Sequence, residues 1–164
     1  MTERILSMRP MLPEDAPLLA EIFRASVAEL AIEDYTESQV EAWAATADDE
    51  EAFAKRLGEQ LTLIAMIDGD PVGFAGMKGN DLIDMLYVHP AAAGQGAASM
   101  LVDALEKLAG ARGSVRLKVD ASDTAEEFFR KRGYVAQSRN TVMRGDEWLA
   151  NTTMHKPLGE RAPQ

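Results

Sequence analysis

The sequence predicts a single α+β domain built around a mixed β-sheet. Apolar residues recur every three or four positions in some segments, as on one face of a helix, and form short strand-like runs in others. These segments follow one another as strand, helices, hairpin, strand, helix, strand, helix and hairpin. A chain of 164 residues is long enough to bury one sizeable core. We expect the domain to cover residues 1–157 and residues 158–164 to form a disordered tail.

The first sixty residues predict one strand followed by three helices. The strand covers residues 3–9 and ends before Pro10. The helices are expected over residues 13–31, 36–43 and 48–58. The first helix is amphipathic because its apolar residues share one helical face. These residues are Leu18, Leu19, Ile22, Phe23, Val27 and Leu30.

The rest of the chain predicts six strands and two helices. The strands are expected over residues 61–67, 71–78, 82–88, 114–119, 135–143 and 148–155. One helix begins at Gly94, with its apolar face continuing to Ala109, and the other covers residues 123–132. Gly133 suits the position after a helix end, where a positive φ is usual.

The net charge and the hydropathy of the sequence limit the kinds of partner that the protein is expected to bind. Seventeen Lys and Arg residues against 27 Asp and Glu residues give a formal net charge of −10. Duplex-binding proteins gain affinity by neutralising phosphates, so this balance argues against a nucleic-acid partner. No apolar run approaches the ~18 residues of a membrane span, and the N-terminus lacks the pattern of a secretory signal. We therefore expect a cytoplasmic monomer or homodimer with no membrane partner.

The most informative segment is the glycine-rich turn at residues 94–99, which lies between a strand and a helix. The first N–H groups of a helix lack internal partners and carry partial positive charge, so a turn of small residues there can hold a pyrophosphate. A plain flexible connection would explain the two glycines as well. A Rossmann site fits poorly, because Ser99 stands where the third glycine is needed, and a P-loop fits worse.

Two motifs make the chain resemble the GNAT superfamily of N-acetyltransferases. Residues 88–90 and 94–98, Val-His-Pro and Gly-Gln-Gly-Ala-Ala, resemble its coenzyme A motif. Residues 122–134 resemble its second signature, with Ala125, Phe128, Gly133 and Tyr134 in register. A YafP-type bacterial branch of the superfamily is the most similar, because it shares Tyr-Thr-x-x-Gln-x-x-Ala-Trp-Ala at residues 35–44 and Ile-Asp-Met-Leu-Tyr-Val at residues 83–88.

The resemblance implies an acetyl-coenzyme A site on a mostly antiparallel sheet of about seven strands flanked by about four helices. Backbone amides of the turn would hold the pyrophosphate, and the preceding strand would pair with the pantetheine arm. The second signature would contribute further contacts. The expected cofactor-binding residues are Leu86, Tyr87, Val88, Gly94, Gln95, Gly96, Ala97, Ala98, Ser99, Ser122, Ala125 and Phe128.

Three positions depart from the family pattern. Ala93 stands where Arg or Gln is usual, and Ser122 replaces an Asn that often reaches the pantetheine. Phe129 replaces the Tyr whose hydroxyl commonly protonates the departing thiolate. Cofactor binding through the backbone survives these changes, but the usual general acid does not. The resemblance to the YafP-type branch, which shares Phe128 and Phe129, implies that a Phe at position 129 is ordinary there.

Two carboxylates are candidates for proton transfer. Strand alternation places Asp84 on the face of Leu86 and Val88, and burial there would raise its pKa toward that of a general base. A partly exposed Asp84 paired with a Lys or Arg is the alternative. Asp120 is a weaker candidate for the base or for binding a cationic substrate, and capping of the following helix would explain it as well.

Aromatic residues near the N-terminus are candidates for the acceptor site. Tyr35 and Trp43 lie on the early helical segment that covers this site in the family, although core packing explains Trp43 equally well. Tyr35, Tyr87 or a water could replace the missing acid. No metal site is expected, because His89 and His155 are isolated, and the absence of cysteine excludes an acetyl-cysteine intermediate.

The predicted reaction is therefore direct transfer of acetyl from acetyl-coenzyme A to a primary amine in a ternary complex. Two alternatives remain open within this fold. One is a non-catalytic acyl-coenzyme A binding or interaction module. The other is a different transfer, either of a longer acyl chain or to a protein N-terminus or lysine.

Overall fold

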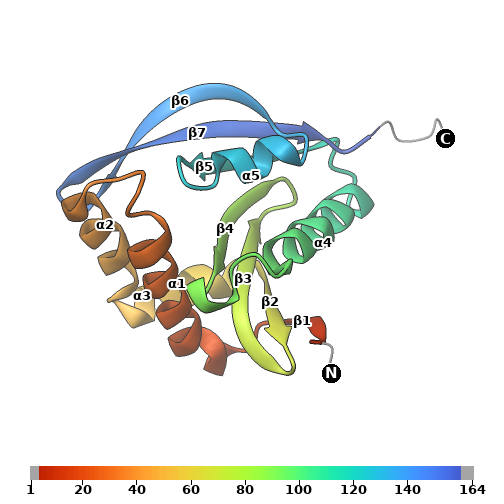
Figure 1. The fold of residues 1–164 in the computed structure, drawn as a ribbon. Coiled ribbons are helices and arrows are strands. Elements are labelled where there is room, and N and C mark those ends of the chain that lie inside the picture. The colour runs from red at the N-terminus through yellow and green to blue at the C-terminus, as the bar shows by residue number, and fades with distance from the viewer. Residues whose placement is uncertain (1–3, 160–164) are drawn as a thin grey trace.

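The computed structural model describes residues 4–159, which form a seven-stranded sheet with helices on both faces (Figure 1). The strands lie in the order β1-β2-β3-β4-β5-β7-β6, and every neighbouring pair is antiparallel except β4 and β5. The predicted α+β class and mixed, mostly antiparallel sheet are confirmed. The strands are β1 Leu6–Pro10, β2 Leu61–Ile67, β3 Asp70–Lys78, β4 Leu82–Val88, β5 Arg116–Ser122, β6 Val135–Arg144 and β7 Glu147–Pro157.

The helices begin and end close to the predicted positions, with three differences at their N-terminal ends. The first predicted helix divides into a 3₁₀ turn, Pro13–Asp15, and α1. The helix predicted from Gly94 begins three residues later, and the last one begins at Glu126. The helices are α1 Ala16–Leu30, α2 Glu37–Ala44, α3 Glu50–Gly58, α4 Ala97–Ala111 and α5 Glu126–Lys131. Thr36 caps α2, and the amide N of Gln39 donates to its hydroxyl oxygen.

The sheet buries a separate hydrophobic cluster on each face. One lies under α1, α2 and α3 and includes Phe23, Tyr35, Phe53, Phe74 and Met85. The other lies under α4 and α5 and includes Leu101, Leu105, Leu117, Phe129, Tyr134 and Met154. Successive residues of a strand point to opposite faces, so β2, β3 and β4 each contribute side chains to both clusters.

The middle of the sheet is irregular in two ways. The parallel pair β4 and β5 is joined only at its start, where Leu82 lies opposite Lys118 and Ile83 opposite Val119. A β-bulge also interrupts the pairing of β3 with β4, because Met85 lies opposite Gly76 while Ile83 lies opposite Met77. Asp84 therefore has no partner on β3.

The end of the chain and the hydropathy of the helices complete the description. The disordered tail was predicted over residues 158–164, of which residues 160–164 lie outside the described residues. At the start of this segment, the amide N of Leu158 donates to the carbonyl O of Val115 over 2.9 Å. Within residues 4–159, no helix is long and apolar enough to span a membrane.

The close approach of β3 and β4 at Gly73 predicts a steric effect. A Cβ at this position would lie 2.9 Å from the backbone O of Tyr87 and 3.1 Å from Cγ2 of Val88. We expect Gly73→Ala to destabilise the fold by about 1–3 kcal/mol, since backbone atoms cannot move aside locally. The measurement is chemical denaturation, with Gly58→Ala as the control, because a Cβ at Gly58 meets nothing within 4 Å. Equal unfolding midpoints for the two variants would contradict this expectation.

Candidate active site

The glycine-rich turn leaves the N-terminus of α4 open. After a 3₁₀ turn at Pro90–Ala92, Gly94 and Gly96 adopt φ angles of 79° and 91°, a region that favours glycine. Gly96 is the N-cap of α4 and offers no side chain to its first amides. A Cβ at Gly94 would meet nothing within 4 Å. The first turn of a fifteen-residue helix is therefore accessible to an anion.

An arginine from the N-terminal segment reaches this turn. Nη1 of Arg4 donates to Oε1 of Gln95 over 2.7 Å. The guanidinium of Arg4 thus lies beside the turn, while Ala93 occupies the position where the family pattern has Arg or Gln. Electrostatically, Arg4 restores a cation close to the predicted phosphate site.

A pocket lies where β4 and β5 separate. It is lined by residues 82–87 of β4 and 119–122 of β5, and Ala125 and Phe129 border it from the α5 side. The structure brings eight of the predicted site residues to this pocket. They are Tyr35, Trp43, Asp84, Leu86, Tyr87, Asp120, Ser122 and Ala125. Val88 and Phe128 do not line it and pack instead against the cluster under α4.

The structure corrects the expected direction of Asp84. The bulge resets the alternation of β4, so Ile83, Leu86 and Val88 face the α4 cluster while the Asp84 carboxylate lies on the side of α3. Its Oδ2 accepts from Nε of Arg56 over 2.9 Å and from Nε2 of Gln60 over 2.8 Å. The prediction that Asp84 shares a face with Leu86 and Val88 was wrong, because it assumed a regular pleat.

The expected pKa shift of Asp84 was also wrong in sign. Burial raises the pKa of this carboxyl, but the hydrogen bonds from Arg56 and Gln60 and the positive charge of Arg56 outweigh burial. The net pKa lies below the ordinary value. Asp84 therefore matches the alternative interpretation, in which it is partly exposed and paired with a Lys or Arg. Its lowered pKa makes it a weak base.

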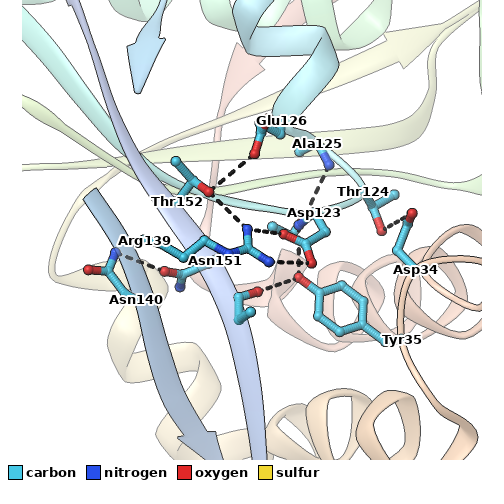
Figure 2. A network of polar contacts seen from close by, with 12 residues as sticks. Asp34, Tyr35, Asp123, Thr124, Ala125, Glu126, Arg139, Asn140, Asn151 and Thr152 are labelled. Carbon is cyan, nitrogen blue, oxygen red and sulfur yellow. Dashed lines mark hydrogen bonds and ion pairs between the residues drawn. The ribbon is translucent and has the colours of Figure 1, made fainter. Parts of the chain in front are cut away.

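Tyr35 is held by two backbone hydrogen bonds. Its hydroxyl donates to the carbonyl O of Ala150 on β7 over 2.7 Å and accepts from the amide N of Asp123 over 2.8 Å. Figure 2 shows this hydroxyl beside Asp123, in the loop that joins β5 to α5. Burial raises the pKa of Tyr35 to about 12. Its proton is already committed to Ala150, so the arrangement suits positioning better than proton donation.

Further polar contacts fix the same loop (Figure 2). Nη2 of Arg139 on β6 donates to Oδ2 of Asp123 over 3.0 Å, and a second bond makes the pair bidentate. The Thr124 hydroxyl donates to Oδ2 of Asp34 over 2.9 Å. The β5–α5 loop is therefore anchored both to β6 and to the segment after α1.

Aromatic rings form one wall of the pocket. The ring of Trp43 lies edge-on to that of Tyr35, with 5.5 Å between centroids, and 6.4 Å from that of Tyr87. Tyr87 in turn contacts Phe23 at 4.6 Å. Burial raises the pKa of Tyr87, which keeps its phenol protonated. Trp43 is only partly buried, so it packs against the core and borders the pocket at once.

Asp120 does not cap the following helix. The N-cap of α5 is Ala125, and the Asp120 carboxylate instead accepts from Oγ1 of Thr153 over 2.6 Å. Asp120 is exposed on β5 and lines the pocket. Phe129, in contrast, is only 1% exposed and packs against Tyr134 at 5.0 Å between centroids. It brings no hydroxyl to the pocket.

Several lining residues were not predicted from the sequence. Arg56 comes from α3, Arg144 from the end of β6 and Asn151 from β7. None belongs to a motif, and only the fold brings them to β4. Among residues 4–159 no group of three or more His, Cys, Asp or Glu side chains is placed to hold a metal ion.

Comparison with known proteins identifies the family of the chain. Residues 31–157 match the family model described as an acetyltransferase (GNAT) domain. The chain is 33% identical over 153 residues to the uncharacterized N-acetyltransferase YafP of Escherichia coli (strain K12), covering 93% of this chain and 97% of YafP.

Solved structures share the fold. A GCN5-related N-acetyltransferase from Rhodopseudomonas palustris, also described as "Aminotransferase, Class-II", is 62% identical with a TM-score of 0.91, covering 92% of this chain and 94% of that one. PaiA N-acetyltransferase from Thermoplasma acidophilum, in complex with coenzyme A, is 21% identical with a TM-score of 0.76. The match covers 93% of this chain and 99% of that one. By the match to the domain model and the identity to YafP, the chain belongs to the GNAT family of N-acetyltransferases.

Proposed function

We propose that the protein transfers acetyl from acetyl-coenzyme A directly to a primary amine, with both substrates bound at once. The observation that carries this proposal is the pocket at the separation of β4 and β5. It is bordered by the β5–α5 loop and by the aromatic wall on the α1 and α2 side. Two substrates entering from these two sides would meet between the strands.

The residues present suit a coenzyme A thioester. The uncapped start of α4 offers amides and a helix dipole to a pyrophosphate, and Arg4 adds a cation nearby. Beyond Ile83, the edge of β4 that faces β5 has no strand partner, so its backbone groups are available to the amides of a pantetheine arm. The thioester supplies the acetyl group and a thiolate leaving group. Binding through the backbone explains why Ala93 and Ser122 are tolerated.

Proton transfer requires a group that can take a proton from the amine. Asp120 lines the pocket, is exposed, and has Thr153 as a hydrogen-bond donor, so it can hold an ammonium group and accept its proton through water. Asp84 is less suited because Arg56 and Gln60 lower its pKa. In place of the hydroxyl that Phe129 lacks, Tyr87 or a pocket water would protonate the thiolate.

Thiol release from acetyl-coenzyme A with a panel of primary amines tests the reaction. Amine-dependent release is expected. Tight coenzyme A binding without thiol release in the presence of any amine would favour the non-catalytic module. Thiol release that depends on protein N-termini, on lysines or on a longer acyl chain would favour the other alternative.

A charge placed at Gly96 is expected to block the cofactor. Gly96→Asp puts a carboxylate where the pyrophosphate would bind, whereas Gly96→Asn has nearly the same shape and faces the same backbone strain at φ 91°. We expect Gly96→Asp to bind coenzyme A at least tenfold more weakly than Gly96→Asn, a difference of about 1.4 kcal/mol. Calorimetry measures both affinities. Equal affinities would remove the pyrophosphate from this turn.

The two pocket carboxylates are expected to respond differently to neutralisation. Asp120→Asn should lower kcat by about 10²–10⁴, because the amide cannot accept a proton from the amine. Asp84→Asn should lose less activity, because the Asp84 carboxylate is already bound by Arg56 and Gln60. Steady-state kinetics of both variants measure the difference, and a larger loss of kcat in Asp84→Asn than in Asp120→Asn would reverse the assignment.

Stability provides an independent readout for Asp84. Since its folded pKa is lowered, its contribution to stability is complete above the unfolded pKa and is lost as the pH falls through the folded pKa. Asp84→Asn should therefore lower the free energy of unfolding at neutral pH, on the order of 1 kcal/mol, because Arg56 is partly exposed. The difference from the unmodified protein should vanish in strong acid. A difference that persists there would point to lost packing.

A further inference from the structure

The charges that line the pocket do not all have partners. Two cations, Arg56 and Arg144, and two carboxylates, Asp84 and Asp120, border it. Arg56 and Asp84 form an ion pair with 2.9 Å between Nε and Oδ2. Within residues 4–159, the donor to the Asp120 carboxylate is the neutral Thr153. One positive and one negative group therefore remain without a charged partner.

Arg144 is the unpaired cation. It ends β6, in the hairpin that packs against α2, where a Cβ on Gly145 would lie 3.6 Å from Cβ of Ala42. Its Nη1 donates to the carbonyl O of Met143 over 2.9 Å, and none of the ion pairs within residues 4–159 includes it. The guanidinium is only partly exposed and lines the pocket beside the aromatic wall.

An arginine in this position suits a planar anion. A guanidinium has five N–H donors, and in the described part of the chain that of Arg144 makes one hydrogen bond, to a backbone carbonyl. Its positive charge also acts on the phenol of Tyr87, in the direction that lowers the Tyr87 pKa, which places the charge close to the pocket interior. A partly buried cation with spare donors gains most from a bidentate carboxylate.

We propose that Arg144 determines acceptor specificity and that the acceptor is an amine carrying a carboxylate at a distance from its nitrogen. The proposal rests on the amine acetyltransferase function argued above. The ammonium group would lie at Asp120 and the carboxylate at Arg144, so the substrate matches both unpaired charges.

Charge and spacing define the substrate further. A single unpaired cation, with Asp84 and Asp120 nearby, favours a monoanion over a phosphate dianion. Asp120 lies opposite Thr153 and Arg144 opposite Glu147. These two positions on β7 are six residues apart, roughly 20 Å along the strand before the side chains reach inward. The pocket wall includes Tyr35, Trp43 and Tyr87. An apolar or aromatic spacer between amine and carboxylate fits this arrangement.

The test compares two amines that differ only in charge, 4-(aminomethyl)benzoate and 4-(aminomethyl)benzamide. The unmodified protein should acetylate the benzoate with a kcat/KM at least tenfold higher than the benzamide. Arg144→Gln should abolish this preference, mainly through the KM of the benzoate, and Arg144→Lys should retain part of it. Arg112→Gln, which removes the same charge beside Asn80 after α4, is the control and should keep the full preference.

The outcomes separate the two proposals. Equal kcat/KM values for the two amines in the unmodified protein, or an unchanged ratio in Arg144→Gln, overturn the role of Arg144 while leaving the acetyltransferase function intact. Acetylation of neutral amines without acetylation of the benzoate would likewise overturn the role of Arg144 and leave the acetyltransferase function intact. Failure to acetylate any amine, charged or neutral, refutes the proposed function itself. Coenzyme A affinity and thermal unfolding of Arg144→Gln should equal those of Arg112→Gln, and a loss confined to Arg144→Gln in either would assign Arg144 to the fold.

Discussion

The separation of β4 from β5 is the constraint on which the rest of the site depends. Two parallel strands that stayed paired along their whole length would satisfy each other's backbone groups and leave no room between them. Here the pairing ends after Ile83 and Val119, while β5 continues in register with β7 as far as Ser122. The sheet remains one body because β3 holds β4 and β7 holds β5. The opening therefore exists without a break in the fold.

The strands and the loop beside this opening are stabilised in different ways. Both β4 and β5 bury side chains in the cluster under α4, where Ile83 and Leu117 lie. The loop between β5 and α5 is held by polar contacts of Asp123 with Tyr35 and Arg139. Polar anchoring suits a loop that must lie beside a binding site, since an apolar anchor there would close the pocket.

The sequence predicted the elements of the fold well and the details of the pocket poorly, for physical reasons. Hydrophobic periodicity located every strand to within a few residues and placed the start of α4 within three residues of Ala97. The positive φ angles of Gly94 and Gly96 became clear only from the structure. The bulge at Asp84 could not be predicted, because alternation assumes a regular pleat. Neither could the sign of its pKa shift, since Arg56 and Gln60 approach it through tertiary packing. Arg144 and Asn151 carry no local signal at all.

The hydroxyl of Tyr35 joins the two halves of the pocket. It bonds the backbone of β7, on the side proposed for the acceptor, and the backbone of the loop before α5, on the side proposed for the cofactor. A ligand that shifts either segment must stretch or relax the same pair of hydrogen bonds. The two binding equilibria are then linked through one side chain. By reciprocity, the free energy by which the first ligand changes the affinity for the second equals the free energy by which the second changes the affinity for the first.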